Sequence, residues 1–444
     1  MKLATRPAGA PLLGELTPPG DKSISHRALI FACLAQGPSR VRGLLESEDV
    51  RATARACGQL GMSMRREGDE WLLEGVGARG LQPPAGPLDM GNSGTAMRLL
   101  AGVLAAQPFA SELIGDASLS RRPMRRIVAP LEQMGACIET AEGGTPPLRI
   151  TGNPGLRGID YESPVASAQV KSCLLLAGLY ASGHTSLREP LKSRDHTEKM
   201  LPAFGVPLVG DCGVRGGSRL TGASLRVPAD ISSAAFFLVA AALVPGSDLL
   251  LRDVGLNETR DGIVHALQAM GADLEVRNRR LFGGEPVGDL RIRYAGRLHG
   301  VDIPVDRVPA MIDELPVILA LAATAEGTTR LRGAAELRVK ESDRLAVMGR
   351  GLRALGVRLD EYDDGMDVHG GPLGAKLDGA GGSVAVDGSG DHRCAMSFCV
   401  LGQVAAGPLL VAGCENIDTS YPGFVADLTT VGGCIAADVD RCRR

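Results

Sequence analysis

A chain of 444 residues is too long for one ordinary hydrophobic core, so we expect two domains. Hydrophobic residues make up 44% of it and charged residues 22%, a balance that is typical of globular proteins and excludes a disordered chain. The formal net charge of -3 argues against a nucleic-acid-binding protein, although a local basic cleft is compatible with it.

The chain begins with MKLATRPAGA, which has no apolar signal core before its first proline, so we expect a cytoplasmic protein. The longest apolar runs, such as AAFFLVAAALV at 234–244, are too short to span a bilayer, and no membrane association is expected. The ten cysteines therefore indicate reduced thiols, and none forms a C-x-x-C pair. Cys394 and Cys399 lie close together, but no second pair completes a zinc set at motif spacing, so we expect no metal.

The first predicted helix follows the turn PPGDKSISHR, in which residues 18–20 are breakers and Asp21 or Ser23 is the N-cap. The start of a helix presents unpaired backbone N–H groups and the positive end of the helix dipole. Because Lys22, Ser23 and Arg27 lie in the same turn, it has the composition of an anion-binding site. The alternative is a capped surface helix whose charges are solvated.

Six segments along the chain share this pattern, a polar or small-residue turn that opens an apolar helix. In chain order they are GDKSISHRALIFACLA, GNSGTAMRLLAGVLA, SPVASAQVKSCLLLAG, PADISSAAFFLVAAAL, VPAMIDELPVILALAA and GDHRCAMSFCVLGQVA. Their apolar residues cover almost every side at helical spacing, which predicts helices that are buried all round.

A second pattern recurs about every 70 residues, a helical stretch that ends in an apolar-Gly-small step before a strand. The stretches are CGQLGMSM, LEQMGACIE, LPAFGVPLV, LQAMGADLEV, LRALGVRLDE and, more weakly, TTVGGCIAA. Their glycines are Gly61, Gly135, Gly205, Gly271, Gly356 and Gly433. Each is predicted to be the C-terminal cap of a helix.

Short strands such as WLLEGVG, LRITG, SLRVPA and LRIRYAG fill the intervening segments. Each repeat is therefore a helix-helix-sheet unit, and three units around one axis would place three buried helices inside and sheets outside. Six units make two such domains, with a crossing from the first to the second near Arg226 in GASLRVPAD. If the buried helices point the same way, their N-terminal dipoles would converge on the gap between the domains and attract anions.

Eight motifs occur in the order DKSISHRALI, GNSGTAMRLL, SLSRRPM, SAQVKS, RDHTEKML, MIDELP, RVKESDRL and GDHRCAMSF. Together they resemble the 3-phosphoshikimate 1-carboxyvinyltransferase (EPSP synthase) family over nearly the whole chain. SAQVKS, RDHTEK and RVKESDR look more like the second sequence class of that family.

The resemblance implies an α/β fold of two inverse α/β barrel domains, each of three repeated helix-helix-sheet units, joined by a hinge. The first domain is then 21–226, and the second is discontinuous, 1–20 plus 227–444, with the N-terminal segment as one of its strands. The implied reaction moves the enolpyruvyl group of phosphoenolpyruvate to the 5-hydroxyl of shikimate 3-phosphate and releases phosphate. No cofactor is implied, the family's inhibitor is glyphosate, and we expect a monomer.

The resemblance also assigns the substrate-binding residues. Those for shikimate 3-phosphate are Lys22, Ser23, Arg27, Ser167, Ala168, Gln169, Arg194, Asp313 and Lys340. Those for phosphoenolpyruvate are Lys22, Asn92, Gly94, Thr95, Arg122, Gln169, Glu341, Arg344 and Arg393. Arginine suits such places because its planar fork matches a carboxylate or a phosphate with two hydrogen bonds.

The reaction needs a base for the 5-hydroxyl and an acid for the methylene carbon of phosphoenolpyruvate. By resemblance Asp313 takes the hydroxyl proton, and Glu341 together with Lys22 handles proton transfer at the methylene carbon. Asp343 and Glu314 are rivals because they lie beside these acids. In a helix, side chains one or two positions apart point to different sides, so one acid of each pair should face the substrates.

Two positions depart from the family's patterns. Some members carry a lysine before the aromatic-Pro step near the C-terminus, where ENIDTSYPG has Thr419. Glyphosate-tolerant members of the second class carry alanine at the position of Gly94, so a glycine there predicts sensitivity despite the second-class motifs elsewhere.

Two other functions are alternatives to this one. UDP-N-acetylglucosamine enolpyruvyl transferases share the six-unit fold, but their early Lys-Asn pair and loop cysteine have no counterpart in DKSISHR. A noncatalytic or nucleic-acid-handling α/β repeat protein would not need the acids Asp313 and Glu341 or the anion-binding motifs in both halves of the chain.

Several polar residues near the motifs are expected to be solvated or to serve local hydrogen bonding and packing, namely Arg121, Arg125, Arg126, His26, His196, His392 and Lys171.

Overall fold

The computed structural model describes residues 1–371 and 384–437. Contacts between residues divide the chain into two units. Unit 1 contains Met1–Pro19, Ala229–Arg280 and the residues from 286 onward, and unit 2 contains Gly20–Pro228 and Leu281–Glu285. Within the described ranges, none of the helices combines the length and the apolar content needed to cross a bilayer.

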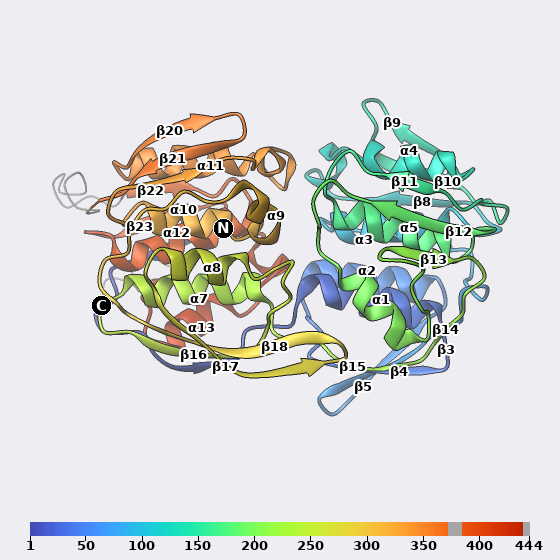
Figure 1. Ribbon diagram of the computed structural model, residues 1–444, viewed down its shortest axis with the longest axis horizontal. Helices are drawn as coiled ribbons and strands as arrows, with labels where there is room; N and C mark the ends of the chain where they lie inside the picture. The colour runs from blue at the N-terminus through green and yellow to red at the C-terminus, as the bar shows by residue number, and fades with distance from the viewer. Residues whose placement is uncertain (372–383, 438–444) are drawn as a thin grey trace. The chain divides into compact units, whose positions relative to one another are not determined.

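Three apolar helices form the core of unit 2: α1 (Lys22–Leu34), α3 (Gly94–Leu104) and α5 (Ala168–Gly178) (Figure 1). Helix α3 packs against both α1 and α5. Every residue of α1 from 24 to 34 is buried, which confirms the predicted burial on nearly all sides. The other helices are α2 (Glu48–Gln59), α4 (Arg125–Gln133) and α6 (His196–Met200), with 3-10 turns at Leu119–Arg121 and Leu201–Phe204.

The sheets of unit 2 are short, and three of the four share one pattern, a parallel pair followed by antiparallel neighbours. One sheet is β15 (Ser224–Arg226), β4 (Pro38–Arg42), β6 (Glu70–Glu74) and β5 (Ser63–Glu67). The next is β7 (Leu88–Asp89), β8 (Ser111–Ile114), β10 (Thr145–Thr151) and β9 (Cys137–Ala141). The last two are β11 (Asp160–Glu162), β12 (His184–Arg188) and β13 (Gly213–Arg215), and the parallel pair β14 (Leu220–Thr221) and β3 (Ala35–Gln36).

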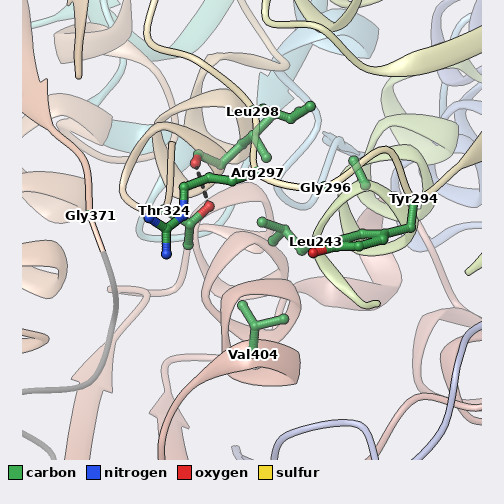
Figure 2. A pocket seen from close by; sticks show the side chains of 10 residues that line it. Leu243, Tyr294, Gly296, Arg297, Leu298, Thr324, Gly371 and Val404 are labelled. Carbon is green, nitrogen blue, oxygen red and sulfur yellow. Dashed lines mark hydrogen bonds between the residues drawn. The ribbon is translucent and has the colours of Figure 1, made fainter. Parts of the chain in front are cut away.

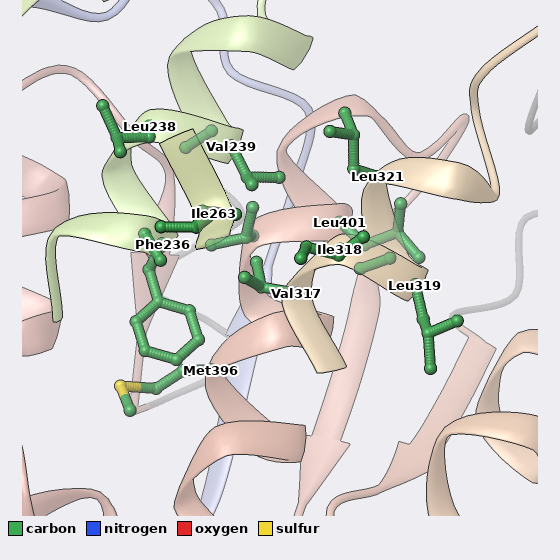
Figure 3. Packing of buried hydrophobic residues seen from close by; sticks show 14 of the residues in the cluster. Phe236, Leu238, Val239, Ile263, Val317, Ile318, Leu319, Leu321, Met396 and Leu401 are labelled. Atoms are coloured by element: carbon green, nitrogen blue, oxygen red, sulfur yellow. The ribbon is translucent and has the colours of Figure 1, made fainter. Parts of the chain in front are cut away.

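Unit 1 is likewise built around three helices, α7 (Ile231–Leu243), α10 (Leu315–Ala322) and α12 (His392–Leu401), each of which contacts the other two. Figure 3 shows the core they share, with Val239, Ile318 and Leu401 among its side chains. The predicted segment VPAMIDELPVILALAA forms two helices rather than one, so a turn that holds Asp313 separates α9 (Val308–Met311) from α10. The other helices are α8 (Gly262–Ala269), α9 (Val308–Met311), α11 (Arg344–Ala354) and α13 (Phe424–Thr430).

In unit 1 the N-terminal strand β1 (Lys2–Thr5) lies between β23 (Leu409–Ala412) and β24 (Ile435–Ala436), antiparallel to both. β22 (Val384–Asp387) continues this sheet beyond β23. The other sheets are β17 (Asp273–Phe282), β18 (Glu285–Arg293), β16 (Asp248–Gly255) and β2 (Leu13–Leu16), and β19 (Thr328–Leu331), β21 (Gly365–His369) and β20 (Arg358–Tyr362). Residues at both ends of the chain therefore build one sheet.

Five of the six predicted glycine caps are confirmed, and one is wrong by one residue. Gly61, Gly135, Gly205, Gly271 and Gly356 all have φ between 80 and 110°, in the left-handed region that favours glycine. At the end of α13 the left-handed residue is Gly432 (φ 106°), and Gly433 follows it. The Gly433 N–H donates to Leu428 O at 2.8 Å, so Gly433 closes the helix-ending turn that Gly432 begins.

Candidate active site

The start of α1 brings together a cap, a lysine and an aspartate in unit 2. Asp21 caps the helix, since its Oδ1 accepts the Ile24 N–H at 2.8 Å. Of the two predicted caps, Asp21 is thus the one used, and Ser23 lies inside the first turn. Lys22 Nζ lies 2.5 Å from Asp49 Oδ2, which fixes the ammonium group beside the start of the helix.

Arg27 is buried and connects three elements of unit 2. Its Nε donates to Thr197 Oγ1 at 2.8 Å, its Nη2 to Ser172 Oγ at 2.6 Å and its Nη1 to Ser23 O at 2.9 Å. Burial lowers the pKa of Arg27 to about 10, although the nearby charges of Glu198 and Asp21 oppose this shift. The guanidinium therefore ties α1, α5 and α6 together.

Helix α3 begins at Gly94 with Ser93 as its cap, and two arginines approach this point. A Cβ at Gly94 would lie 2.8 Å from Nη1 of Arg98 and 3.2 Å from Nη1 of Arg122. Arg122 donates from Nη2 to Asn92 Oδ1 at 2.5 Å. Glycine thus leaves room for two guanidinium groups at a helix N-terminus, an arrangement suited to an anion.

Gln169 is held by the same region of unit 2. Its Nε2 donates to Thr95 Oγ1 at 2.9 Å, and its Oε1 accepts from Nη1 of Arg98 at 2.6 Å. Arg98 was not among the predicted residues. It lies four positions after Gly94, one helical turn further along the same face, and this spacing was the signal that could have found it.

Ser167 caps α5, since its Oγ accepts the Val170 N–H at 3.4 Å. Ala168 is the first residue of the helix. The Ser167 N–H donates to Glu189 Oε1 at 2.7 Å, a partner that sequence reasoning missed. Arg194 is half-buried in the segment just before α6.

In unit 1 three carboxylates surround one buried guanidinium. Arg344, 1% exposed, donates from Nη1 to Asp313 Oδ1 at 3.0 Å, and from Nη2 to Glu341 Oε2 at 2.5 Å. Its Nε donates to Asp391 Oδ2 at 2.8 Å. Burial alone would lower the pKa of Arg344, but the charges of Asp391, Glu341 and Asp313 outweigh it and raise that pKa well above its ordinary value.

Asp391 was not among the predicted site residues. Its Oδ1 accepts the Arg393 N–H at 3.0 Å and caps α12, while its Oδ2 accepts Arg344 Nε and, at 3.1 Å, Ser342 Oγ. An aspartate directly before an apolar helix is a capping signal, but its second oxygen could not be placed from the sequence.

Two further cations lie near Asp313. Arg393 donates from Nη1 to the Asp313 backbone O at 3.3 Å, and its Nη2 lies 3.8 Å from Asp313 Oδ2. Lys340 Nζ lies 4.0 Å from Asp313 Oδ1. The structure thus brings Asp313, Lys340, Glu341, Arg344 and Arg393 into one charged cluster of unit 1.

The rival acids have other partners. Glu314 is fully buried and accepts a short hydrogen bond from Ser232 Oγ, with Arg260 Nη2 at 3.7 Å. Asp343 caps α11 through the Ala346 N–H at 3.0 Å and pairs with Arg338 at 2.8 Å. Both serve the local fold, whereas Asp313 and Glu341 share Arg344.

Most of the residues expected to have local roles have them. Arg121 and Arg125 are exposed. His26 is buried between Thr53 and Ser93, and His196 Nδ1 lies 2.8 Å from Glu285 Oε1. Thr419, where some relatives have lysine, is buried and donates to Asn416 O at 2.7 Å. Lys171 is buried and pairs with Glu189 and Glu198.

A pocket of about 220 Å³ lies elsewhere in unit 1 (Figure 2). Leu243, Tyr294, Arg297 and Thr324 are among its lining residues. It lies near the C-terminal ends of α7 and α10, away from the helix starts that carry the charged cluster. None of the predicted site residues lines it, so it is not the candidate active site.

Comparison with known proteins identifies the relatives of this chain. Residues 7–428 match the family model described as EPSP synthase (3-phosphoshikimate 1-carboxyvinyltransferase). The 3-phosphoshikimate 1-carboxyvinyltransferase of Xanthomonas campestris pv. campestris (strain B100) is 56% identical over 420 residues, 94% of this chain and 94% of the relative. That of Xanthomonas oryzae pv. oryzae (strain PXO99A) is 54% identical over 94% of this chain and 93% of its own. A solved structure of EPSP synthase from Acinetobacter baumannii superimposes with a TM-score of 0.85 at 47% identity, covering 98% of this chain and 99% of that one.

Proposed function

This chain belongs to the EPSP synthase (3-phosphoshikimate 1-carboxyvinyltransferase) family, and we propose that the residues at the starts of α1, α3 and α5, together with the charged cluster of unit 1, carry the reaction of that family. The protein is a transferase of the shikimate pathway of aromatic amino acid biosynthesis. It moves the enolpyruvyl group of phosphoenolpyruvate to the 5-hydroxyl of shikimate 3-phosphate and releases phosphate. The observation that carries our assignment of roles is that Arg344 holds Asp313 and Glu341 on one guanidinium.

We assign shikimate 3-phosphate to residues at helix starts and to a few neighbouring polar groups. They are Lys22, Ser23, Arg27, Ser167, Ala168, Gln169, Arg194, Asp313 and Lys340. The starts of α1 and α5 supply backbone N–H groups and dipoles that favour a phosphate, which supports this assignment.

We assign phosphoenolpyruvate to Lys22, Asn92, Gly94, Thr95, Arg122, Gln169, Glu341, Arg344 and Arg393. Two guanidinium groups beside Gly94 support this assignment, because phosphoenolpyruvate carries both a carboxylate and a phosphate. The contact of Arg344 with three carboxylates shows that its guanidinium can hold carboxylate oxygens.

The chemistry proceeds by addition and elimination. The 5-hydroxyl oxygen bonds to C2 of phosphoenolpyruvate, its proton passes to Asp313, and the methylene carbon gains a proton from Glu341 with help from Lys22. The resulting ketal then loses a proton from the new methyl group, the C2–O bond to phosphate breaks, and the enol ether forms. The cations around Asp313 and Glu341 offset the negative charge that accompanies these steps.

Release of inorganic phosphate on mixing both substrates tests this function. We expect release only when shikimate 3-phosphate and phosphoenolpyruvate are both present. Phosphate release with UDP-N-acetylglucosamine in place of shikimate 3-phosphate would instead support the related transferase. If the folded protein releases no phosphate with either acceptor, both transferase functions are refuted.

Finer properties follow from the resemblance and are part of the proposal. Units 1 and 2 would be inverse α/β barrels of three repeats joined by a hinge, with domains at 21–226 and at 1–20 plus 227–444. The three central helices in each unit support this, as does the parallel pair with antiparallel neighbours that recurs in three sheets of unit 2 and two sheets of unit 1. We further propose a monomeric, cytoplasmic enzyme of the second sequence class that glyphosate inhibits.

A further inference from the structure

A buried lysine, Lys171, and two buried glutamates, Glu189 and Glu198, form an ion-pair cluster near the start of α5. Lys171 Nζ lies 3.1 Å from Glu189 Oε2 and 2.8 Å from Glu198 Oε1, and its side chain is 3% exposed. It also donates to Ser193 O at 3.4 Å. The side chains of Glu189 and Glu198 are 6% and 9% exposed. None of these three residues has a part in the reaction scheme above.

Glu189 holds two separate segments in place. Its Oε1 accepts the Ser167 N–H at 2.7 Å, which fixes the turn that opens α5. Its Oε2 accepts the Ser193 N–H at 3.2 Å, and the Ser193 hydroxyl lies 2.7 Å from Oε1 and 2.8 Å from Oε2. Ser193 directly precedes Arg194. One carboxylate therefore connects the turn of Ser167 to the segment of Arg194.

The charges of the cluster also matter. A bare carboxylate behind a phosphate-binding turn would repel the phosphate, and its burial without a partner would be costly. The ammonium of Lys171 offsets Glu189, and burial, which would lower the pKa of Lys171, is outweighed by Glu198 and Glu189, so this pKa is raised. Glu198 also faces the charge of Arg27. Because Lys171 offsets its charge, Glu189 can hold the Ser167 turn in place without repelling an anion bound there.

We propose that Glu189, with Lys171 offsetting its charge, is a positioning residue for the phosphate of shikimate 3-phosphate. It aligns the Ser167 turn with the Ser193–Arg194 segment, so that the hydroxyl and N–H donors at the start of α5 face the phosphate in one arrangement. This inference rests on the proposed function, and it concerns residues that do not touch the substrate themselves.

The test compares shikimate 3-phosphate with shikimate, which lacks the phosphate, by calorimetric binding. In Glu189→Ala we expect the dissociation constant of shikimate 3-phosphate to rise roughly tenfold to hundredfold, the range for hydrogen bonds to charged groups. Shikimate should lose much less affinity, and the KM for phosphoenolpyruvate should stay unchanged. Removing a negative charge would by itself tighten phosphate binding, so weaker binding identifies positioning rather than simple electrostatics.

Further variants separate the two parts of the proposal. Lys171→Met, which leaves Glu189 without its ammonium partner, should also selectively weaken the binding of shikimate 3-phosphate. Lys171→Arg, which keeps a positive charge, should retain much of that binding. Lys192→Met is the matched control, because Lys192 is 59% exposed in the same loop and its ammonium group lies 3.3 Å from Asp195 Oδ2. It should bind both ligands like the unmodified protein.

Circular dichroism and thermal melting establish that each variant is folded. If Lys171→Met does not fold, the positioning role of Glu189 is tested by comparing the affinity for shikimate 3-phosphate of Glu189→Ala with that of the milder variant Glu189→Gln. Equal loss of shikimate and shikimate 3-phosphate in folded Glu189→Ala, or no loss of either, would overturn the positioning role. Failure of the unmodified protein to bind shikimate 3-phosphate would refute the proposed function instead.

Discussion

Nη1 of Arg344 donates to Oδ1 of Asp313 at 3.0 Å, inside a cluster where the same guanidinium also holds Glu341 and Asp391. Because Arg344 is almost fully buried, its charge needs several carboxylates, and the loss of one leaves two in place. Each acid can therefore be replaced in turn, so that its proposed catalytic role can be tested separately from its role in stability.

We therefore expect Asp313→Asn and Glu341→Gln to remain folded and to lose most of their turnover. Loss of a positioned acid or base lowers the rate by roughly 100- to 10,000-fold. Steady-state phosphate release, with thermal melting as the folding check, measures both. Near-normal kcat in either variant would remove that residue from its assigned role.

Asp343→Ala is the matched control, because Asp343 lies beside these acids but caps α11. Loss of a helix cap lowers the free energy of unfolding by about 1 kcal/mol. We expect that destabilisation in urea titrations, together with a turnover far closer to the unmodified enzyme than that of Asp313→Asn. A collapse of turnover in a folded Asp343→Ala would mean that the acids have been assigned the wrong way round.

Gly94→Ala should weaken glyphosate more than phosphoenolpyruvate. The added methyl group would lie 2.8 Å from Arg98 Nη1 and 3.2 Å from Arg122 Nη1, so both guanidinium groups must move while their hydrogen bonds hold them. Glyphosate is the longer molecule and tolerates a smaller pocket less well. The inhibition constant of glyphosate and the KM for phosphoenolpyruvate, measured on both proteins, check this. Equal weakening of both ligands, or resistance in the unmodified enzyme, contradicts the role of Gly94.

The first turn of α1 allows capping and substrate binding to be separated. Asp21→Ala removes the acceptor of the Ile24 N–H and should lower the free energy of unfolding by about 1 kcal/mol. Ser23→Ala should leave stability within about 0.5 kcal/mol of the unmodified protein, as is usual away from caps and cores, and should raise the KM for shikimate 3-phosphate. A stability loss in Ser23→Ala as large as that in Asp21→Ala would mean that Ser23 also caps the helix.

The burial of His26 in its neutral form should lower the free energy of unfolding of the protein in mild acid. Burial, reinforced by the charges of Lys22 and Arg27, holds the pKa of His26 well below its ordinary value. The unfolded chain therefore takes up a proton below about pH 6.5 that the folded protein does not, and the stability that neutral His26 contributes is lost as the pH falls.

Urea unfolding of His26→Gln and the unmodified protein between pH 5 and pH 8 tests this. The variant should lose less free energy of unfolding on acidification, since the other titrating groups are common to both proteins. Parallel pH profiles would show that His26 is not buried in its neutral form.

Local features of this fold could be predicted because neighbouring residues encode them. In α7 a single stretch contains the cap Asp230 and the apolar residues that follow it, so the start and the burial of the helix are both evident. Glycine caps follow the same logic. The error at Gly433 arose because two adjacent glycines satisfy one pattern, and only backbone φ distinguishes them.

Pairings between distant segments could not be predicted in this way. Asp391 is 47 residues from Arg344, and Glu189 is 22 residues from Ser167. No periodicity connects such positions, because the sheets and turns between them set the distance. Lys171 illustrates the difficulty, since a lysine within an apolar helix gives no sign of the two carboxylates that other elements bring to it.

The position of β1 has a consequence for biosynthesis. Its partners at 409–412 and 435–436 leave the ribosome more than 400 residues later, a delay of roughly 20 to 80 s at synthesis rates of about 5–20 residues per second. During that interval the contiguous stretch from Gly20 to Pro228 is already complete and can fold, while the first strand waits with unpaired backbone groups. A translation arrest late in the message would therefore release a nascent chain with one finished half and an open β-edge, the kind of species that chaperones recognise.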